Sequence, residues 1–437
     1  MRSPYFSHTL HYLHFCIACI ARIVSIACIA CIVFIACIAC IVPITVRGQH
    51  TGGETGFVRL LAMKGYENVR VARRSDTLFV GCENRVWRWE PRAAAEILKL
   101  VMPAVDSAGV VSLTLLKTGI PLTTLIVTRK DYDDLRAGRL PEGAFAHSAT
   151  ALLPDRVYRA GIGRIQPANP SFSKFDVVVY PQLRMQFGNF DHPLELQFNI
   201  APAVRVSFWQ GMSLTAQVIF PVYNNLTTDP EGNTIRPGLL VLSQSFRLPG
   251  MVFATLNAGY FTRSRYGLNG EMRKFMFNGK IALGAAIGYT SQMQFIDGSF
   301  IFKPEEAVTW FCDAAWRWAR YDLTLRAGYG RFIGLDQGWR VDVSRQFGEV
   351  SIGFFAMQTG DQVNGGFNFI VPIPPRRYGT KNQVRIRPAS YVPWEYRAKG
   401  LNSYGRSFST GNGTDEMLFN LNPDYIRKQV GKEVLKL

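Results

Sequence analysis

The stretch QLRMQFGNFDHPLELQFNIAP, residues 182–202, alternates apolar and polar side chains on both sides of a turn predicted at 188–193. A period of two residues places successive side chains on opposite faces of a strand. The pattern therefore predicts two antiparallel strands, each with one apolar and one polar face. The apolar set is Leu183, Met185, Phe187, Leu194, Leu196, Phe198 and Ile200.

The same alternation recurs from residue 175 to residue 373. It is clear in MSLTAQVIFPVY, LVLSQSFRL, VTWFCDAAWRW, DLTLRAGYG and WRVDVSRQF, and it continues through VSIGFFAM and GGFNFIVPI. About 10 to 12 such segments fit into this length, which leaves no room for crossover helices. The fold class expected is mainly β, with an antiparallel meander after a small α/β domain.

The apolar faces could meet either a protein core or lipid, because the strands of a soluble sandwich also alternate. Several segments reach nine residues or more, the length that a tilted membrane-spanning strand needs. Tight turns, as at 188–193 and 249–250, contrast with a longer polar loop at 223–238. Aromatic side chains fall towards segment ends, as in an interfacial girdle: Trp310, Trp316, Trp318, Tyr329 and Trp339. We therefore predict a transmembrane β-barrel over residues 175–373.

The polar faces would then line the interior of this barrel. The candidate lumen-facing residues are Arg184, Glu195, Arg205, Arg247, Asp313, Arg317, Asp322, Arg326, Arg340 and Asp342. Six cations and four anions leave a small positive excess, which could attract anionic solutes. The other interpretation is that these residues form structural ion pairs inside the barrel.

Residues 50–145 read as a small α/β domain on the periplasmic side. ETGFVRLLAMKG predicts a helix that ends at Gly65, and the next strands turn at 74–76. Pro91 opens an amphipathic helix, and Gly119 marks a β-hairpin. Residues 146–174, interrupted by several prolines, are expected to form a linker.

The first 48 residues form an apolar leader that carries six of the eight cysteines. Its C-x-x-C pairs lack the flanking turns and polar groups that a metal site needs, so no metal or cofactor is expected. The leader is either an overlong signal peptide, a retained transmembrane helix over about 23–46, or a lipidation signal. Each alternative exports the rest of the chain from the cytoplasm.

Residues 374–437 are basic and rich in Pro, Gly and Ser, and we expect them to form a solvated periplasmic tail. The formal net charge of the whole chain is +17, which suits an anionic partner. Export makes nucleic acid a poor candidate for that partner. No zinc helix, nucleophile elbow or plausible acid/base pair is found, so the chain is not expected to be an enzyme.

Three groups of motifs resemble the YjbH family of outer-membrane exopolysaccharide and capsule biosynthesis proteins. They are GYENVRV with ENRVWRW in the small domain, GWRVDVSRQFGEVSIGFFAM near the end of the meander, and GGFNFIVPIPPRRY after it. The resemblance covers about residues 55–400 and rests on structural motifs. It implies an outer-membrane barrel with a periplasmic portion that assists secretion or assembly of an extracellular polysaccharide.

The function expected is assistance in biosynthesis, assembly or export of an exopolysaccharide at the outer membrane of a Gram-negative cell. The partners expected are outer-membrane lipid, an anionic polysaccharide and other export proteins. A general porin for small solutes is the alternative, for which the small domain and the basic C-terminal stretch would be surplus.

Overall fold

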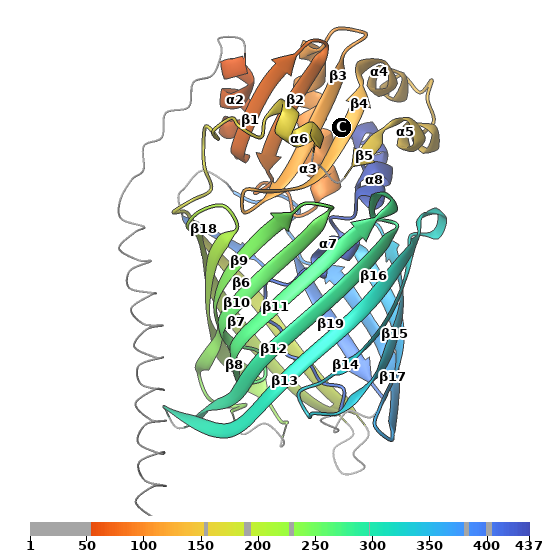
Figure 1. Cartoon of the computed structure of the whole chain (residues 1–437). Coiled ribbons are helices and arrows are strands. Elements are labelled where there is room, and N and C mark those ends of the chain that lie inside the picture. The colour runs from red at the N-terminus through yellow and green to blue at the C-terminus, as the bar shows by residue number, and fades with distance from the viewer. Residues whose placement is uncertain are drawn as a thin grey trace, which may run out of the picture. The chain divides into compact units, whose positions relative to one another are not determined.

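The computed structural model of the chain describes residues 54–152, 156–187, 194–226, 231–296, 298–379, 384–398 and 404–437. Two β-sheets account for most of these residues, one of five strands and one of 14 (Figure 1). No helix in these ranges is long and apolar enough to cross a lipid bilayer. The leader and the turn at 188–193 lie outside the described residues.

The five-stranded sheet belongs to the small domain and has the order β1-β2-β3-β4-β5. Its helices are α2 (Glu54–Met63), α3 (Glu90–Val101), α4 (Arg129–Arg136), α5 (Glu142–Ser148) and α6 (Arg156–Gly161), with a 3-10 turn at Met102–Ala104. Its strands are β1 (Glu67–Arg74), β2 (Thr77–Glu83), β3 (Val110–Lys117), β4 (Ile120–Thr128) and β5 (Thr150–Leu152). The helix before Gly65, the helix at Pro91 and the hairpin at Gly119 lie where the pattern predicts them.

Helix α3 is the crossover between β2 and β3, which are the parallel pair in this sheet. Pro91 lies in its first turn, where a missing backbone N–H costs nothing. The apolar face of α3, including Ile97 and Leu98, is fully buried against the sheet. The core of the small domain therefore lies between α3 and the strands.

The last helix of the chain completes this core, which differs from the solvated tail expected for residues 374–437. Helix α8 (Pro423–Leu435) begins at Asn422, whose side chain accepts a hydrogen bond from the Asp424 amide at 3.1 Å. Its side chains Ile426, Val430 and Val434 are buried in the same cluster as the α3 residues. This helix is short, and it follows a stretch rich in Ser, Gly and Asn. The composition of residues 374–437 therefore did not predict it.

The expected linker also differs from the structure. Within 146–174, β5 pairs with β4, and Ile162 packs beside Tyr158 in a second cluster of the small domain. Prolines interrupt the hydrophobic periodicity of a segment, but short helices and strands can still form between the prolines.

From β6 to β17 the large sheet is a meander in which each strand pairs antiparallel with the next. Its first twelve strands are β6 (Phe175–Phe187), β7 (Leu194–Ser207), β8 (Met212–Asn224), β9 (Arg236–Leu248), β10 (Val252–Phe261), β11 (Arg265–Met276), β12 (Ile281–Ile296), β13 (Ser299–Trp318), β14 (Leu323–Arg331), β15 (Gln337–Phe347), β16 (Val350–Thr359) and β17 (Gln362–Pro372). In β6 and β7, Leu183 lies opposite Phe198 and Met185 opposite Leu196, which confirms the predicted pairing. The count of 14 exceeds the expected 10 to 12 because two further strands follow a proline-rich stretch.

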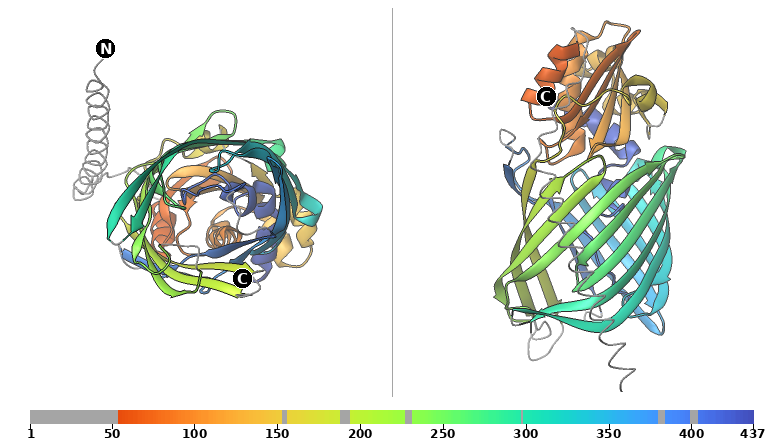
Figure 2. Two further views of the ribbon diagram at one scale, coloured as in Figure 1. Left: turned by 90° about the horizontal axis from the view of Figure 1, so that it is seen from below. Right: turned by 60° about the vertical axis from the view of Figure 1, so that its left-hand side comes forward.

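These two strands, β18 (Val384–Pro388) and β19 (Tyr391–Arg397), form one segment that reaches both edges of the meander. β18 runs parallel to β6, whereas β19 pairs antiparallel with β17. Between them, the Ala389 amide donates to the Val179 carbonyl at 2.9 Å. The sheet curves round until this segment connects its first and last long strands (Figure 2). The hydrogen-bonded order begins at β18 and ends at β19, and no ladder joins those two among the described residues.

Burial in the large sheet is inverted relative to a soluble protein. Large apolar side chains are exposed on its outer face, among them Val204, Phe220, Leu240, Leu256, Leu268, Leu283, Ile287, Val341, Ile352 and Phe354. Polar side chains are buried on the inner face, among them Gln197, Thr215, Ser243, Asn257, Asn269, Arg273, Asp313, Ser344 and Gln346. The apolar faces predicted from the sequence therefore point outward and do not form a core.

Exposed aromatic rings form two clusters at different levels of this outer face. Trp316 stacks on Trp318, whose ring meets Tyr321 edge-on at 4.8 Å. In the second cluster the Tyr329 ring lies 4.7 Å from that of Trp339. Leu323, the cross-strand partner of Trp318, and Tyr329 are six residues apart, about 20 Å along β14.

Removing packing from α8 should destabilise the small domain. Ile426 is fully buried and Leu435, on the same helix, is 50% exposed. Ile426→Ala should lower the free energy of unfolding by about 2–5 kcal/mol, whereas Leu435→Ala should change it by about 0.5 kcal/mol or less. Urea unfolding followed by circular dichroism measures both, and equal small effects would show that α8 does not belong to this core.

Candidate functional site

The interior of the curved sheet contains a segment that we term the strap, residues 404–422. At one end the Gly405 amide donates to the Asp336 carboxylate at 2.7 Å, in the loop between β14 and β15. At the other end the Asn422 side chain donates to the Gly279 carbonyl at 2.9 Å, in the turn between β11 and β12. These turns lie at opposite ends of the strands, so the strap runs the length of the interior (Figures 1 and 2).

The strap contacts the inner wall along its whole course. Phe408 stacks on Phe261 with ring centroids 5.2 Å apart. The Thr414 amide donates to the Glu271 carboxylate at 2.8 Å. Near the small domain the strap contains α7 (Glu416–Phe419), whose Met417 and Leu418 pack with Ile120 of β4. The strap thus links the inner wall of the large sheet to the small domain.

A quartet of two arginines and two aspartates holds the middle of the strap. Asp313 on β13 accepts from Arg273 on β11 at 2.9 Å and from Arg326 on β14 at 2.8 Å. Asp415 of the strap accepts from the same two guanidinium groups at 2.7 Å and 3.1 Å. The four formal charges cancel, so this part of the interior is neutral and cross-linked.

Two other predicted groups of residues also meet in ion pairs. Arg340 contacts Asp342 on its own strand and Glu395 on β19, both at 2.7 Å. At the small-domain end, Arg317 contacts Asp322 at 2.9 Å, and Asp322 also accepts from Lys428 of α8 at 2.7 Å. The sequence pattern predicts Asp322 as the first residue of a strand, but it lies in the turn between β13 and β14.

The remaining predicted residues are spread over the inner wall and its rim. Arg184 donates to Gln197 at 3.2 Å, and Glu195 is buried nearby on β7. Arg205 donates to the Gly411 carbonyl of the strap at 3.3 Å. Arg247 donates to the Pro121 carbonyl of the small domain at 2.7 Å. The predicted set therefore does not form one site: six of its residues meet in three ion-paired groups, and the other four lie elsewhere on the inner wall and its rim.

Several residues that complete these groups were missed from the sequence. Glu271 and Arg273 alternate with Met272 and Lys274 in β11, so the period-two signal could have identified them. Asp415 and Glu395 could not be found in this way, because both lie in the stretch that reads as a tail.

Three of the cavities along the strap are large and lined by charged side chains. A cavity of about 1010 Å³ opens at the end farther from the small domain, and one of about 650 Å³ surrounds the Arg/Asp quartet. The third, of about 320 Å³, lies between the small domain and the sheet, and we term it the near chamber.

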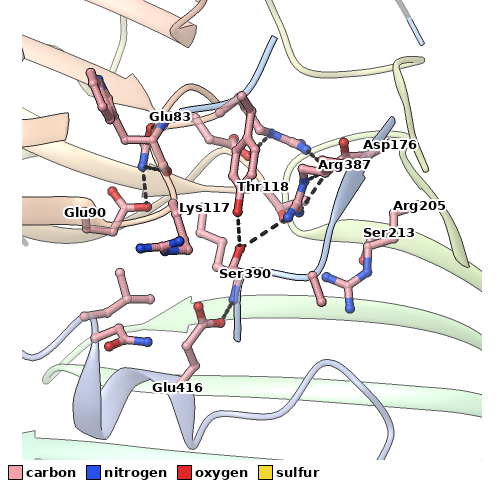
Figure 3. A pocket seen from close by; sticks show the side chains of 18 of the residues that line it. Glu83, Glu90, Lys117, Thr118, Asp176, Arg205, Ser213, Arg387, Ser390 and Glu416 are labelled. Atoms are coloured by element: carbon pink, nitrogen blue, oxygen red, sulfur yellow. Dashed lines mark hydrogen bonds and ion pairs between the residues drawn. The ribbon is translucent and has the colours of Figure 1, made fainter. Parts of the chain in front are cut away.

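Four parts of the fold supply the near chamber. Glu90 and Lys117 come from the small domain, Arg205 from β7, Tyr391 from β19 and Glu416 from the strap. Figure 3 shows Glu90 and Arg205 on opposite sides of this pocket, with Lys117 and Ser390 between them. The chamber is thus assembled only when all four parts are in place.

The charged groups around the near chamber are mostly paired. Asp176 accepts from Arg387 at 3.2 Å and lies 3.3 Å from both Arg385 and Arg85. Lys117 contacts Glu416. Burial raises the pKa of Glu90 to about 8, although Asn84 donates a hydrogen bond to its Oε1 at 3.0 Å. Glu90 is therefore mostly a neutral acid near pH 7.

No group of three or more His, Cys, Asp or Glu side chains suited to a metal occurs within the described ranges.

The quartet predicts a graded response to the loss of one carboxylate. The Asp313 side chain is 3% exposed and bonds both arginines, whereas that of Asp415 is 58% exposed. Asp313→Asn should lower the free energy of unfolding by about 3–5 kcal/mol, because it leaves buried cations short of a partner. Asp415→Asn should cost about 1 kcal/mol or less. Equal shifts of the urea midpoint would contradict this assignment.

The family model described as YjbH, "Exopolysaccharide biosynthesis protein YbjH", matches residues 53–237 and 231–369. The two matches together span 53 to 369, which is 317 of the 437 residues. No curated protein matches the chain.

Among solved structures, the chain is similar to OmpTdeltaL8, a loop L8 deletion mutant of OmpT, an outer membrane protein of Vibrio cholerae. The identity is 5%, the TM-score is 0.24, and the match covers 45% of this chain and 85% of that one. The family match alone spans well over half of the sequence, and it agrees with the motifs in the small domain and at the end of the meander. The chain belongs to the YjbH family of exopolysaccharide biosynthesis proteins.

Proposed function

We propose that this protein is an outer-membrane β-barrel of a Gram-negative cell that helps to assemble or export an anionic exopolysaccharide. The observation that carries the membrane location is the inverted burial of the large sheet, with apolar side chains outside and polar side chains inside. A soluble monomer rarely exposes a contiguous apolar patch of more than a few hundred Å². In a bilayer the same apolar surface would contact the lipid hydrocarbon chains.

The aromatic clusters support the same orientation. Trp316 and Trp318 lie at one level and Trp339 at another, separated by about 20 Å along the strand. Because barrel strands tilt by about 35–45°, this spacing corresponds to a height of about 15 Å, which lies within the apolar band of about 25 Å that aromatic girdles flank in outer-membrane barrels. The segment 384–397 supports closure, because a lipid-exposed strand edge would leave backbone groups without partners.

The role in polysaccharide export rests on the family and on the interior. The strap and its quartet occupy the space through which small solutes would pass in a general porin. An interior crossed by a tethered segment, with a domain at one end, fits a specific assembly or export role better. We propose a transport role without catalysis, with the small domain contacting other export proteins.

The lipid-facing assignment is tested by a charge on the outer face of β10. Leu256 lies mid-strand and is 57% exposed. Leu256→Arg should destabilise the folded barrel by about 2–4 kcal/mol if this surface meets the middle of the bilayer, but by about 0.5 kcal/mol or less if it meets water.

The measurement is the migration of unboiled outer-membrane samples on a denaturing gel. The wild type should migrate faster unboiled than boiled, and Leu256→Arg should lose this shift at a lower temperature. Leu256→Met is the matched control and should keep the wild-type temperature. A soluble periplasmic protein with no shift would overturn the membrane assignment.

The export role is tested in a strain that lacks the gene. Secreted exopolysaccharide should fall strongly and return on complementation with the wild-type gene. The purified protein in a planar bilayer should conduct far less than a general porin, because the strap occupies its interior. Undiminished secretion together with a large steady conductance would favour the porin alternative.

A further inference from the structure

One arginine in the near chamber, Arg205, lacks the carboxylate partner that the neighbouring cations have. Lys117 pairs with Glu416, Arg85 with Glu83, Arg88 with Glu349, and Arg385 and Arg387 with Asp176. Among the described residues, no carboxylate lies within ion-pair distance of Arg205. Its Nη2 donates to a strap carbonyl, that of Gly411, and its guanidinium lies 5.8 Å from the Tyr180 ring centroid.

We propose that the near chamber binds one acidic sugar unit of the polysaccharide, with its carboxylate on Arg205. This inference rests on the proposed export function and assigns a site within it. A guanidinium group offers planar, paired N–H donors that match a carboxylate, and such charge-assisted hydrogen bonds are among the stronger ones in proteins.

Three polar atoms without hydrogen-bond partners lie just behind the chamber wall. Arg205 Nε, Tyr391 Oη and Glu90 Oε2 are buried and have no hydrogen-bond partner in the described structure. They belong to β7, β19 and α3, three elements that meet around this cavity.

The size and the charges of the chamber limit further which ligands it can hold. About 320 Å³ lies at the lower end of the range for small-molecule sites, so a single sugar unit fits better than a longer segment. Glu90 opposes Arg205 across the chamber (Figure 3). As a mostly neutral acid near pH 7, it does not repel an anion bound in the chamber.

The position of the chamber relates this binding to the strap. Arg205 contacts Gly411, and Lys117 of the small domain contacts Glu416. An acidic sugar on Arg205 would therefore lie beside the strap at the small-domain end of the interior, before the two larger cavities. The chamber is thus placed to recognise the polymer as it enters.

Binding to the purified full-length protein in detergent at pH 7 tests the inference. The probes are a glucuronic acid trisaccharide and a glucose trisaccharide of the same linkage, titrated by calorimetry. The wild type should bind the acidic probe at least tenfold more tightly. Arg205→Gln should lower that affinity at least tenfold without changing the affinity for the neutral probe, and Arg205→Lys should lie between.

Arg320→Gln is the matched control, because it removes the same charge at an exposed position outside the chamber. It should bind both probes like the wild type. The gel shift of each variant establishes that it is folded before it is titrated.

Equal affinity of the wild type for both probes would overturn the inference, as would equal effects of Arg205→Gln and Arg320→Gln. Secretion in the deletion strain distinguishes this failure from failure of the export role. Secretion that depends on the gene, without selective binding of the acidic probe, would reject only the chamber. Undiminished secretion in that strain would reject the export role itself.

Discussion

The structure depends on the pairing of the two outer edges of a long β-meander. Every edge strand presents backbone N–H and C=O groups that need partners, and lipid supplies none. Residues 384–397 meet this need with one segment, because β18 pairs with β6 and β19 pairs with β17. The curvature that brings these edges together also creates an interior, and the inner wall, the cavities and the strap all follow from it.

The interior combines small apolar clusters against the strap with a largely polar inner face that is stabilised by ion pairs. Most of its charges occur in groups that nearly cancel, such as Asp313 and Asp415 with Arg273 and Arg326. Such groups add little to stability beyond the desolvation that they offset, but they specify which strands and which part of the strap lie together. Arg205 and Arg263 depart from this pattern, since among the described residues no carboxylate lies within ion-pair distance of either.

The sequence predicted the parts of the fold that follow a local period. Alternation placed the strands, their pairing in β6 and β7 and the outward direction of Leu183, because one residue of slippage would move every apolar side chain to the wrong face. The small domain was recognisable from helix and hairpin signals such as Pro91 and Gly119. The strap and α8 were not, since their partners lie more than a hundred residues away and their composition resembles that of a tail. For the same reason the sequence produced a list of interior charges without the pairs that organise them.

The location of α8 constrains the order in which the protein can form. Ile426, Val430 and Val434 complete a core that otherwise comes from residues 58–151, so the small domain lacks part of its interior until residues 423–435 have been made. The strap that precedes α8 is fixed to the inner wall at both ends, so the sheet must curve around it or admit it before closing. Folding of the small domain is thereby coupled to completion of the large sheet, and a chain cut short before residue 423 would leave both parts unfinished.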